Sequence, residues 1–160
     1  MGTCPTQWEN KKASGVVYMP LEPYLSPPII VEVQHSVDIE FIFRIMSYCE
    51  QLYSQVNIAP VVLIIVVSSI NHEVLGKCRA RKQVPFLFQY RKETWAKSCY
   101  RASVDTIHRH TQKVSLDPMV NLMAFLTGRK PSLSDSGYST DPTMQQLYSI
   151  AERAFVSCHE

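Results

Sequence analysis

The stretch IIVEVQHSVDIEFIFRIMSYCEQLYSQVNIAPVVLIIVVSS, residues 29–69, decides the fold because it joins two β-branched runs through one amphipathic segment. Residues 29–34 are rich in Ile and Val and follow two prolines, which predicts a strand. Residues 60–68 are almost entirely apolar, as in a strand that is covered on both faces of a sheet. A strand, a helix and a strand with about 30 residues between the two strand starts predict a βαβ unit and an α/β fold.

The segment between these strands, residues 36–55, is predicted to be a helix. Ser36 is a favourable N-cap, and Asp38 and Glu40 fall in the first turn, where the helix dipole stabilises negative charge. Apolar side chains then recur every three or four residues, which indicates one buried stripe. The stripe consists of Val37, Phe41, Ile45, Tyr48 and Leu52. We expect the helix to end at Asn57.

The rest of the chain is expected to add two short strands and several helices. Residues 15–19 and 84–90 have the composition of strands, and the second is expected at an edge of the sheet. Residues 71–83 are expected to form a loop or a short helix. Residues 92–110 are predicted to be helical, because apolar side chains recur there at roughly helical spacing.

One domain is expected from a chain of 160 residues. Residues 1–28 are predicted to be a loop-rich N-terminal segment with one short strand, and residues 29–91 to be the α/β core. Residues 92–160 are predicted to be a helical C-terminal extension of the same domain. Within it, helices at 117–128 and 141–157 begin with Asp-Pro pairs, which place a cap and a proline at the helix start.

The cysteines and the apolar runs bear on the cellular compartment. Five cysteines are widely spaced and include no C-x-x-C pair, which favours reduced thiols in an intracellular protein, nuclear or cytoplasmic. The longest apolar run, residues 59–67, is about half as long as a membrane span requires. No membrane partner is therefore expected, and the sequence indicates no oligomeric state.

Positive charge is concentrated in one part of the sequence. Residues 77–113 contain ten Lys or Arg and two acidic residues, a net charge of +8, whereas the whole chain has a net charge of +2. Such a segment favours a polyanionic partner such as DNA, although a solvated helix face has the same pattern. The candidate DNA-binding residues are Lys77, Arg79, Arg81, Lys82, Arg91 and Lys92.

Polar side chains in the first βαβ unit form a candidate site. Glu32 and Gln34 project from one face of their predicted strand, because strand side chains alternate with a period of two. Arg44 and Tyr48 are four residues apart and therefore share one face of the predicted helix. A carboxylate, an amide, a guanidinium and a phenol are thus expected around one cleft.

With these residues the sequence resembles the PD-(D/E)XK nuclease superfamily, most of all its transposase-like group of recombination-promoting nucleases. The resemblance covers residues 29–67, about a quarter of the chain. It is carried by VEVQ, FIFRIMSYCEQLYSQ and PVVLIIVV. The matching residues are Glu32, Gln34, Phe41, Arg44, Tyr48, Leu52, Tyr53 and Pro60. It implies a restriction-endonuclease-like mixed central sheet flanked by helices, with a nuclease-like core over residues 29–91.

The resemblance also implies Mg²⁺-dependent hydrolysis of DNA phosphodiester bonds, with Mn²⁺ as a substitute metal. By this resemblance, Glu32 would bind the metal together with a carboxylate from the preceding strand, and Gln34 would orient the attacking water. Arg44 would contact the scissile phosphate, and Tyr48 would hydrogen-bond it or brace Glu32. Mg²⁺ prefers such oxygen ligands, lowers the pKa of a bound water and neutralises the developing charge.

The sequence departs from the family pattern at the second carboxylate. The family has an Asp on the strand before Glu32, but the only acidic residues upstream of Glu32 are Glu9 and Glu22. We take Glu22 as the tentative second metal ligand. Two alternatives stay open, a catalytically inactive relict that binds nucleic acid or protein, and a purely structural Glu32 paired with Arg44.

Overall fold

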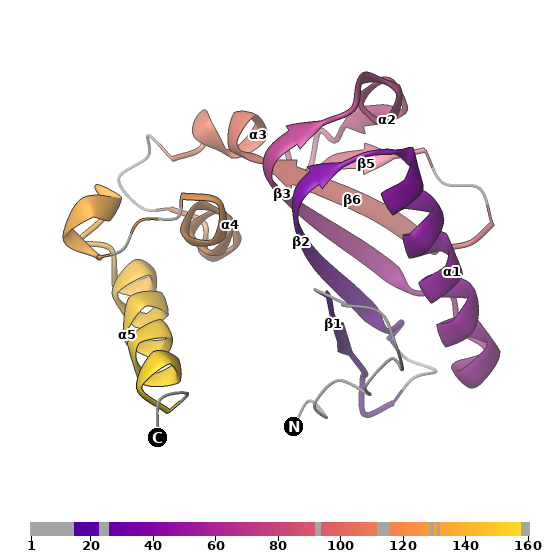
Figure 1. Cartoon of the computed structure of the whole chain (residues 1–160), viewed down its shortest axis with the longest axis horizontal. Coiled ribbons are helices and arrows are strands. Elements are labelled where there is room, and N and C mark those ends of the chain that lie inside the picture. The colour runs from indigo at the N-terminus through magenta and orange to yellow at the C-terminus, as the bar shows by residue number, and fades with distance from the viewer. Residues whose placement is uncertain are drawn as a thin grey trace.

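The described part of the chain forms one six-stranded mixed sheet with helices on both faces (Figure 1). The computed structural model describes residues 15–22, 26–91, 94–111, 116–128, 130 and 132–157. The strands are β1 (Gly15–Tyr18), β2 (Ile29–Val37), β3 (Val61–Ile70), β4 (Cys78–Ala80), β5 (Phe88–Tyr90) and β6 (Ser98–Ser103). The helices are α1 (Ile39–Val56), α2 (His72–Gly76), α3 (Val104–His108), α4 (Pro118–Gly128), η1 (Ser134–Ser136) and α5 (Pro142–Ser157).

The strand order across the sheet is β1-β2-β3-β6-β5-β4. The strands β2, β3 and β6 run parallel in the middle, whereas β1 at one edge and the β5–β4 hairpin at the other are antiparallel to their neighbours. The unit β2-α1-β3 is the βαβ unit that the sequence predicts. The expectation of a mixed α/β sheet flanked by helices is thereby confirmed.

Helix α1 covers one face of the sheet and β2 leads directly into it. Its N-cap is Asp38, whose carboxylate accepts a hydrogen bond of 2.8 Å from the Phe41 amide. The expected cap, Ser36, instead belongs to β2, because the ladder with β3 continues to Val37. At the other end, Asn57 adopts the left-handed conformation, with φ 56°, and donates its amide proton to the Tyr53 carbonyl.

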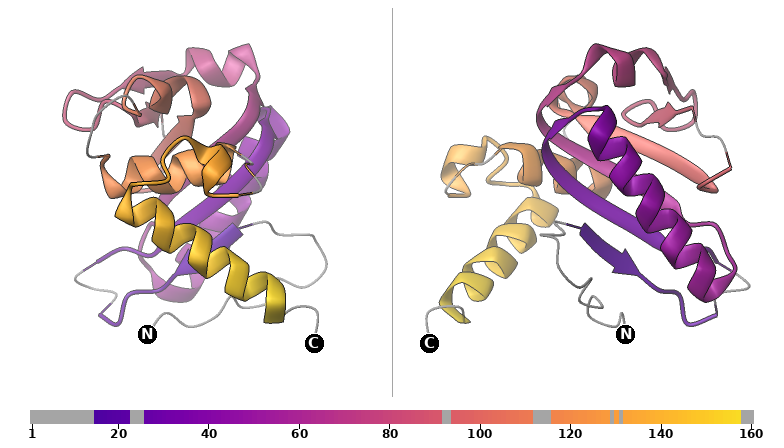
Figure 2. Two further views of the ribbon diagram at one scale, coloured as in Figure 1. Left: turned by 90° about the vertical axis from the view of Figure 1, so that its left-hand side faces the viewer. Right: turned by 45° about the vertical axis from the view of Figure 1, so that its right-hand side comes forward.

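The hydrophobic core lies on both faces of the central strands. On one face, Ile45 and Cys49 of α1 are fully buried with Val62 of β3. On the other face, Ile65 of β3 is fully buried with Met123 of α4. Helix α5 packs on α4 and extends away from the sheet, as the right-hand view of Figure 2 shows. Two apolar layers therefore enclose the parallel strands, which explains why residues 60–68 are almost continuously apolar.

The prediction of one helix over residues 92–110 is wrong. Residues 98–103 form β6, which pairs in parallel with β3 and antiparallel with β5, and only Val104–His108 is helical. Hydrogen bonds from strands on both sides override the local helical pattern of this segment. Of its six residues, five are buried, as expected for an inner strand.

The strand predicted over residues 84–90 is shorter than expected and covers only Phe88–Tyr90. The preceding residues form a turn, in which the Leu87 amide donates to the Val84 carbonyl at 3.0 Å. Pro85 in this turn has no amide proton and cannot donate to a strand ladder. In residues 71–83, the structure adds β4 after the short helix α2.

The long apolar run of residues 59–67 lies largely in β3, as predicted. No helix among the described residues combines the length and the apolar character that a membrane span requires.

Candidate functional site

Glu32 lies in the middle of β2, on the sheet face that α1 covers. Its register partners are Gly15 on β1 and Ile64 on β3, and its side chain is only 3% exposed. The side-chain amide of Gln34 donates a hydrogen bond of 3.2 Å to Glu32 Oε2. The strand thus brings together the carboxylate and the amide that the sequence predicts to share one face.

Gly15 provides the space that the Glu32 carboxylate occupies. A Cβ atom at Gly15 would overlap Oε1 and Cδ of Glu32. The carboxylate therefore leans across β1, at a position where only glycine fits without moving it. No pattern in the sequence indicates this contact, because it depends on the antiparallel register between β1 and β2.

Arg44 and Tyr48 lie on the flank of α1 that faces the β1–β2 side. The opposite flank, with Phe43 and Met46, lines a hollow together with Trp95 near β5. Tyr48 is half-buried against the core, whereas Arg44 is exposed.

The guanidinium of Arg44 stacks on the Phe41 ring, 5.2 Å from its centroid. In the described part of the chain it forms no ion pair with Glu32. The alternative of a structural Glu32–Arg44 pair is therefore wrong.

Glu22 lies in the connection between β1 and β2 and is exposed. This connection follows Tyr18, which pairs with Ile29, whereas Glu32 pairs with Gly15 at the opposite end of β1. The structure therefore does not bring Glu22 to Glu32. Within the described ranges, no group of three or more His, Cys, Asp or Glu side chains could hold a metal ion.

Several of the predicted basic residues gather on the β4–β5 hairpin at the sheet edge. Arg79 on β4 and Arg91 after β5 line a shallow hollow with Gln89. The guanidinium of Arg81 donates a hydrogen bond of 2.6 Å to the Tyr100 hydroxyl, and its Cζ lies 5.3 Å from the centroid of that ring.

We call Arg79, Arg81 and Arg91 the basic edge. Lys77 follows α2 as its C-cap, and Lys82 is exposed beyond β4. These two lysines add positive charge at both ends of β4. The last predicted member, Lys92, lies outside the described residues.

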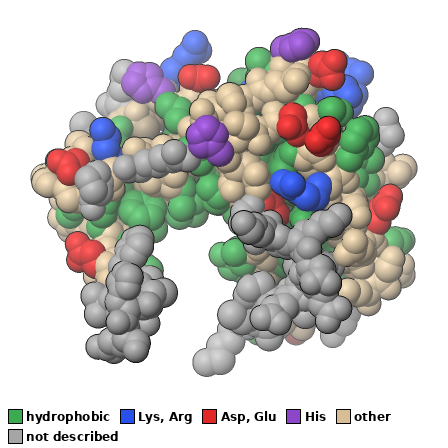
Figure 3. All heavy atoms as spheres, in the orientation of Figure 1, with side chains coloured by type: hydrophobic (Ala, Val, Ile, Leu, Met, Phe, Trp, Pro, Cys, Tyr) green, Lys and Arg blue, Asp and Glu red, His purple; other side chains and the backbone are tan. Residues whose placement is uncertain are grey.

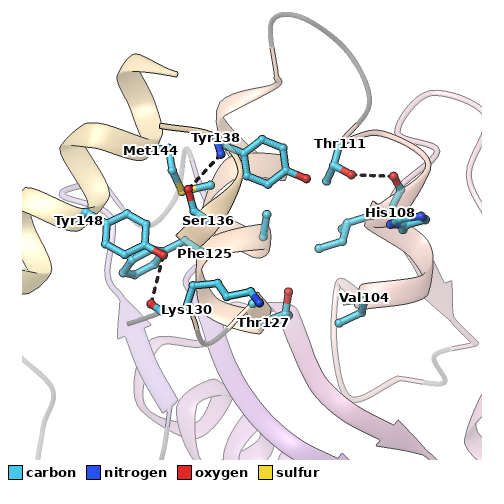
Figure 4. Close-up of a pocket in the computed structure, with 13 residues that line it drawn as sticks. Val104, His108, Thr111, Phe125, Thr127, Lys130, Ser136, Tyr138, Met144 and Tyr148 are labelled. Carbon is cyan, nitrogen blue, oxygen red and sulfur yellow. Dashed lines mark hydrogen bonds between the residues drawn. The ribbon is translucent and has the colours of Figure 1, made fainter. Parts of the chain in front are cut away.

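A pocket of about 330 Å³ lies between α3, α4 and the segment that leads into α5 (Figure 4). Three of its hydroxyl groups donate to carbonyl groups of the chain. Ser136 Oγ donates to the Leu133 carbonyl at 2.6 Å, Thr111 Oγ1 donates to the His108 carbonyl at 2.8 Å, and the Tyr148 hydroxyl donates to the Lys130 carbonyl at 3.2 Å. The lining offers a ligand mainly apolar contacts.

A second pocket, of about 670 Å³, lies at the carboxyl ends of β3 and β6 between α2 and α3. Its polar lining includes Arg101 and Ser103 of β6 and Arg109 after α3. In the view of Figure 3, charged and histidine side chains gather along the upper rim, over α2 and α3. Sequence reasoning missed this pocket, because it placed Arg101 on a helix.

No protein-family model matches the chain, and no curated protein or solved structure matches it. The resemblance to PD-(D/E)XK nucleases therefore stays a prediction.

Proposed function

We propose that this chain binds the phosphate backbone of DNA along its basic edge, on a sheet of the restriction-endonuclease type. The observation that carries the proposal is the set of three guanidinium groups on one edge hairpin, with Arg81 held in place by Tyr100. Guanidinium groups match phosphate geometry in a bidentate way, and contacts to the backbone dominate DNA affinity.

Basic residues on an edge strand also have a simpler explanation. Charged side chains keep the edge of a sheet from pairing with the edge of another molecule. Arg79 on β4 would serve that purpose without any ligand. The two explanations differ in their consequence, because only a DNA-binding edge changes the salt dependence of binding when a charge is removed.

We expect the variant Arg79→Gln to bind DNA more weakly and with a shallower salt dependence than the wild type. Loss of one phosphate contact lowers the slope of log K against log salt concentration by about 0.9. Fluorescence anisotropy of a labelled duplex, titrated at several salt concentrations, measures both quantities. Arg91→Gln is expected to behave in the same way.

The matched control is Arg153→Gln on α5, the helix that extends away from the sheet (Figure 2). The Arg153 Nε donates to the Ser149 carbonyl at 3.2 Å. The variant removes the same charge and should leave the slope unchanged. Equal slopes in Arg79→Gln and Arg153→Gln would contradict the proposal. So would the absence of binding by the wild type at about 50 mM salt.

Metal-dependent hydrolysis of DNA is a second candidate function, favoured by the buried Glu32 and the Gln34 amide bonded to it. The residues present do not fit a complete Mg²⁺ site. Glu32 supplies one carboxylate, one of its oxygens already accepts from Gln34, and Glu22 lies at the other end of the hairpin. We therefore derive no catalytic step through a metal.

The variant Glu32→Gln separates the two candidates. DNA binding should be unchanged, because β3 and β6 separate Glu32 on β2 from the basic edge at β5 and β4, and the Gln amide oxygen can still accept from Gln34. Plasmid nicking with Mg²⁺ or Mn²⁺ measures hydrolysis. Nicking by the wild type that is lost in Glu32→Gln would establish hydrolysis, and no nicking in either metal would exclude it.

A further inference from the structure

Arg101 is a buried cation whose charge is not matched by a carboxylate in the described part of the chain. Its side chain is 5% exposed, and its Nε has no hydrogen-bond partner. Nη1 donates to Ser103 Oγ at 3.3 Å, and Cζ stacks 4.8 Å from the centroid of Phe88. Burial of an unpaired charge is costly, so this arrangement calls for an anion.

The fold keeps the buried carboxylate of Glu32 away from Arg101. Glu32, Ile64 and Arg101 are register partners across β2, β3 and β6, so they share one row and one face of the sheet. Two strand spacings separate Glu32 from Arg101, about 10 Å between their backbones. The buried side chain of Ile64 lies in the row between them.

Arg101 instead lines the pocket of about 670 Å³ between α2 and α3. Crevices outside the carboxyl ends of parallel strands are common ligand sites. Arg109 and His110 add basic groups to the lining, and Asp105 is the carboxylate in it. Asp105 forms no ion pair with Arg101 in the described chain, so the guanidinium stays available to a ligand.

The rest of the pocket lining indicates which kind of molecule would carry the anion. Ile70, Leu75, Pro85 and Phe88 form an apolar wall beside the polar groups. Ser103 Oγ accepts from Arg101 and retains its own proton for an acceptor. Donors from β6 and from the chain after α3 line the same pocket. A phosphate offers more oxygens to such a set of donors than a carboxylate does.

We propose that this pocket binds a phosphomonoester carried on an apolar or aromatic body, with Arg101 as its principal anion-binding residue. Arg101 projects from the sheet face opposite to Tyr100, on which Arg81 of the basic edge stacks. The pocket is therefore separate from the basic edge, and its ligand site does not depend on DNA binding there.

Phenyl phosphate, inorganic phosphate and benzoate are suitable probes, titrated at matched ionic strength up to about 10 mM with the melting temperature as the readout. We expect a saturable rise in melting temperature with phenyl phosphate, a smaller rise with inorganic phosphate and the smallest with benzoate. The Arg Nε–H resonance of Arg101, followed by ¹H–¹⁵N NMR, should shift in step with phenyl phosphate binding.

The variants Arg101→Met and Arg101→Lys test the assigned residue. Each should weaken phenyl phosphate binding at least tenfold, whereas the charge control Arg153→Gln on α5 should bind it as the wild type does. Because Arg101→Lys retains a positive charge but loses the planar guanidinium, it separates the contribution of the guanidinium from that of charge alone. No saturable shift in the wild type, equal binding in Arg101→Lys, or benzoate binding as tight as that of phenyl phosphate would overturn the proposal.

Discussion

The variant Cys49→Ala is expected to lose about 4 kcal/mol less stability than the wild type as the pH rises from 9 to 12, because it has no Cys49 thiol to ionise. Cys49 of α1 is fully buried against the sheet. Burial, and to a lesser extent the charge of Glu50, raises the pKa of its thiol from 9.0 to about 12. In the unfolded chain the thiol ionises near pH 9, whereas the folded protein holds the proton. The stabilisation is therefore complete below pH 9 and is lost as the pH rises to about 12.

Urea unfolding under reducing conditions, from about pH 8 to about pH 11.5, measures this effect as a difference between wild type and Cys49→Ala. The variant is less stable at pH 8 because of its cavity, but its stability should fall less steeply with pH. Burial also raises the pKa of the fully buried Cys99 thiol, so that part of the slope remains in Cys49→Ala.

Cys78→Ala is the matched control for this comparison. Burial raises the pKa of the Cys78 thiol as well, but the nearby Arg101 guanidinium opposes the rise. Its replacement should therefore change the slope less than that of Cys49 does. Equal slopes in the wild type and Cys49→Ala would show that the thiol ionises without penalty, and that the core at α1 admits water.

The variant Arg101→Met is expected to be more stable than the wild type by about 1–4 kcal/mol when no anion is bound. Methionine fills the volume of the side-chain stem and removes a charge that the described chain leaves without a carboxylate. The losses are the stacking on Phe88, the hydrogen bond to Ser103 at 3.3 Å and the interaction with the Cys78 thiol. Together these are smaller than the cost of holding a guanidinium out of water.

Equilibrium unfolding in a buffer without phosphate, sulfate or carboxylate anions measures this difference. Arg81→Met is the matched control, because that guanidinium is only half-buried and bonds to the Tyr100 hydroxyl at 2.6 Å. Its loss should lower stability by about 1 kcal/mol. A loss of stability in Arg101→Met as well would mean that Phe88 and Ser103 compensate the buried charge, and that the fold has no need of an anion.

Local patterns predicted the part of the candidate site that depends on one element. Glu32 and Gln34 share a face because successive strand side chains alternate, and the structure joins them by a hydrogen bond. The relation of Glu32 to the upstream residues depended on strand register. The β1–β2 pairing places Gly15 opposite Glu32 and moves Glu22 to the other end of the hairpin.

By itself the sequence determined the unit of residues 29–69 and the Asp-Pro helices, because their periodicity, caps and stop residues act within a few neighbouring residues. Only the tertiary structure decided that residues 98–103 form a strand, since β3 and β5 supply hydrogen bonds that outweigh local preference. The same decision placed the guanidinium of Arg101 inside the protein, in the row of Glu32 but two strands away. Burial of a charge depends on the elements that pack around it. Those elements are distant in the sequence, so the residues next to Arg101 do not predict its burial.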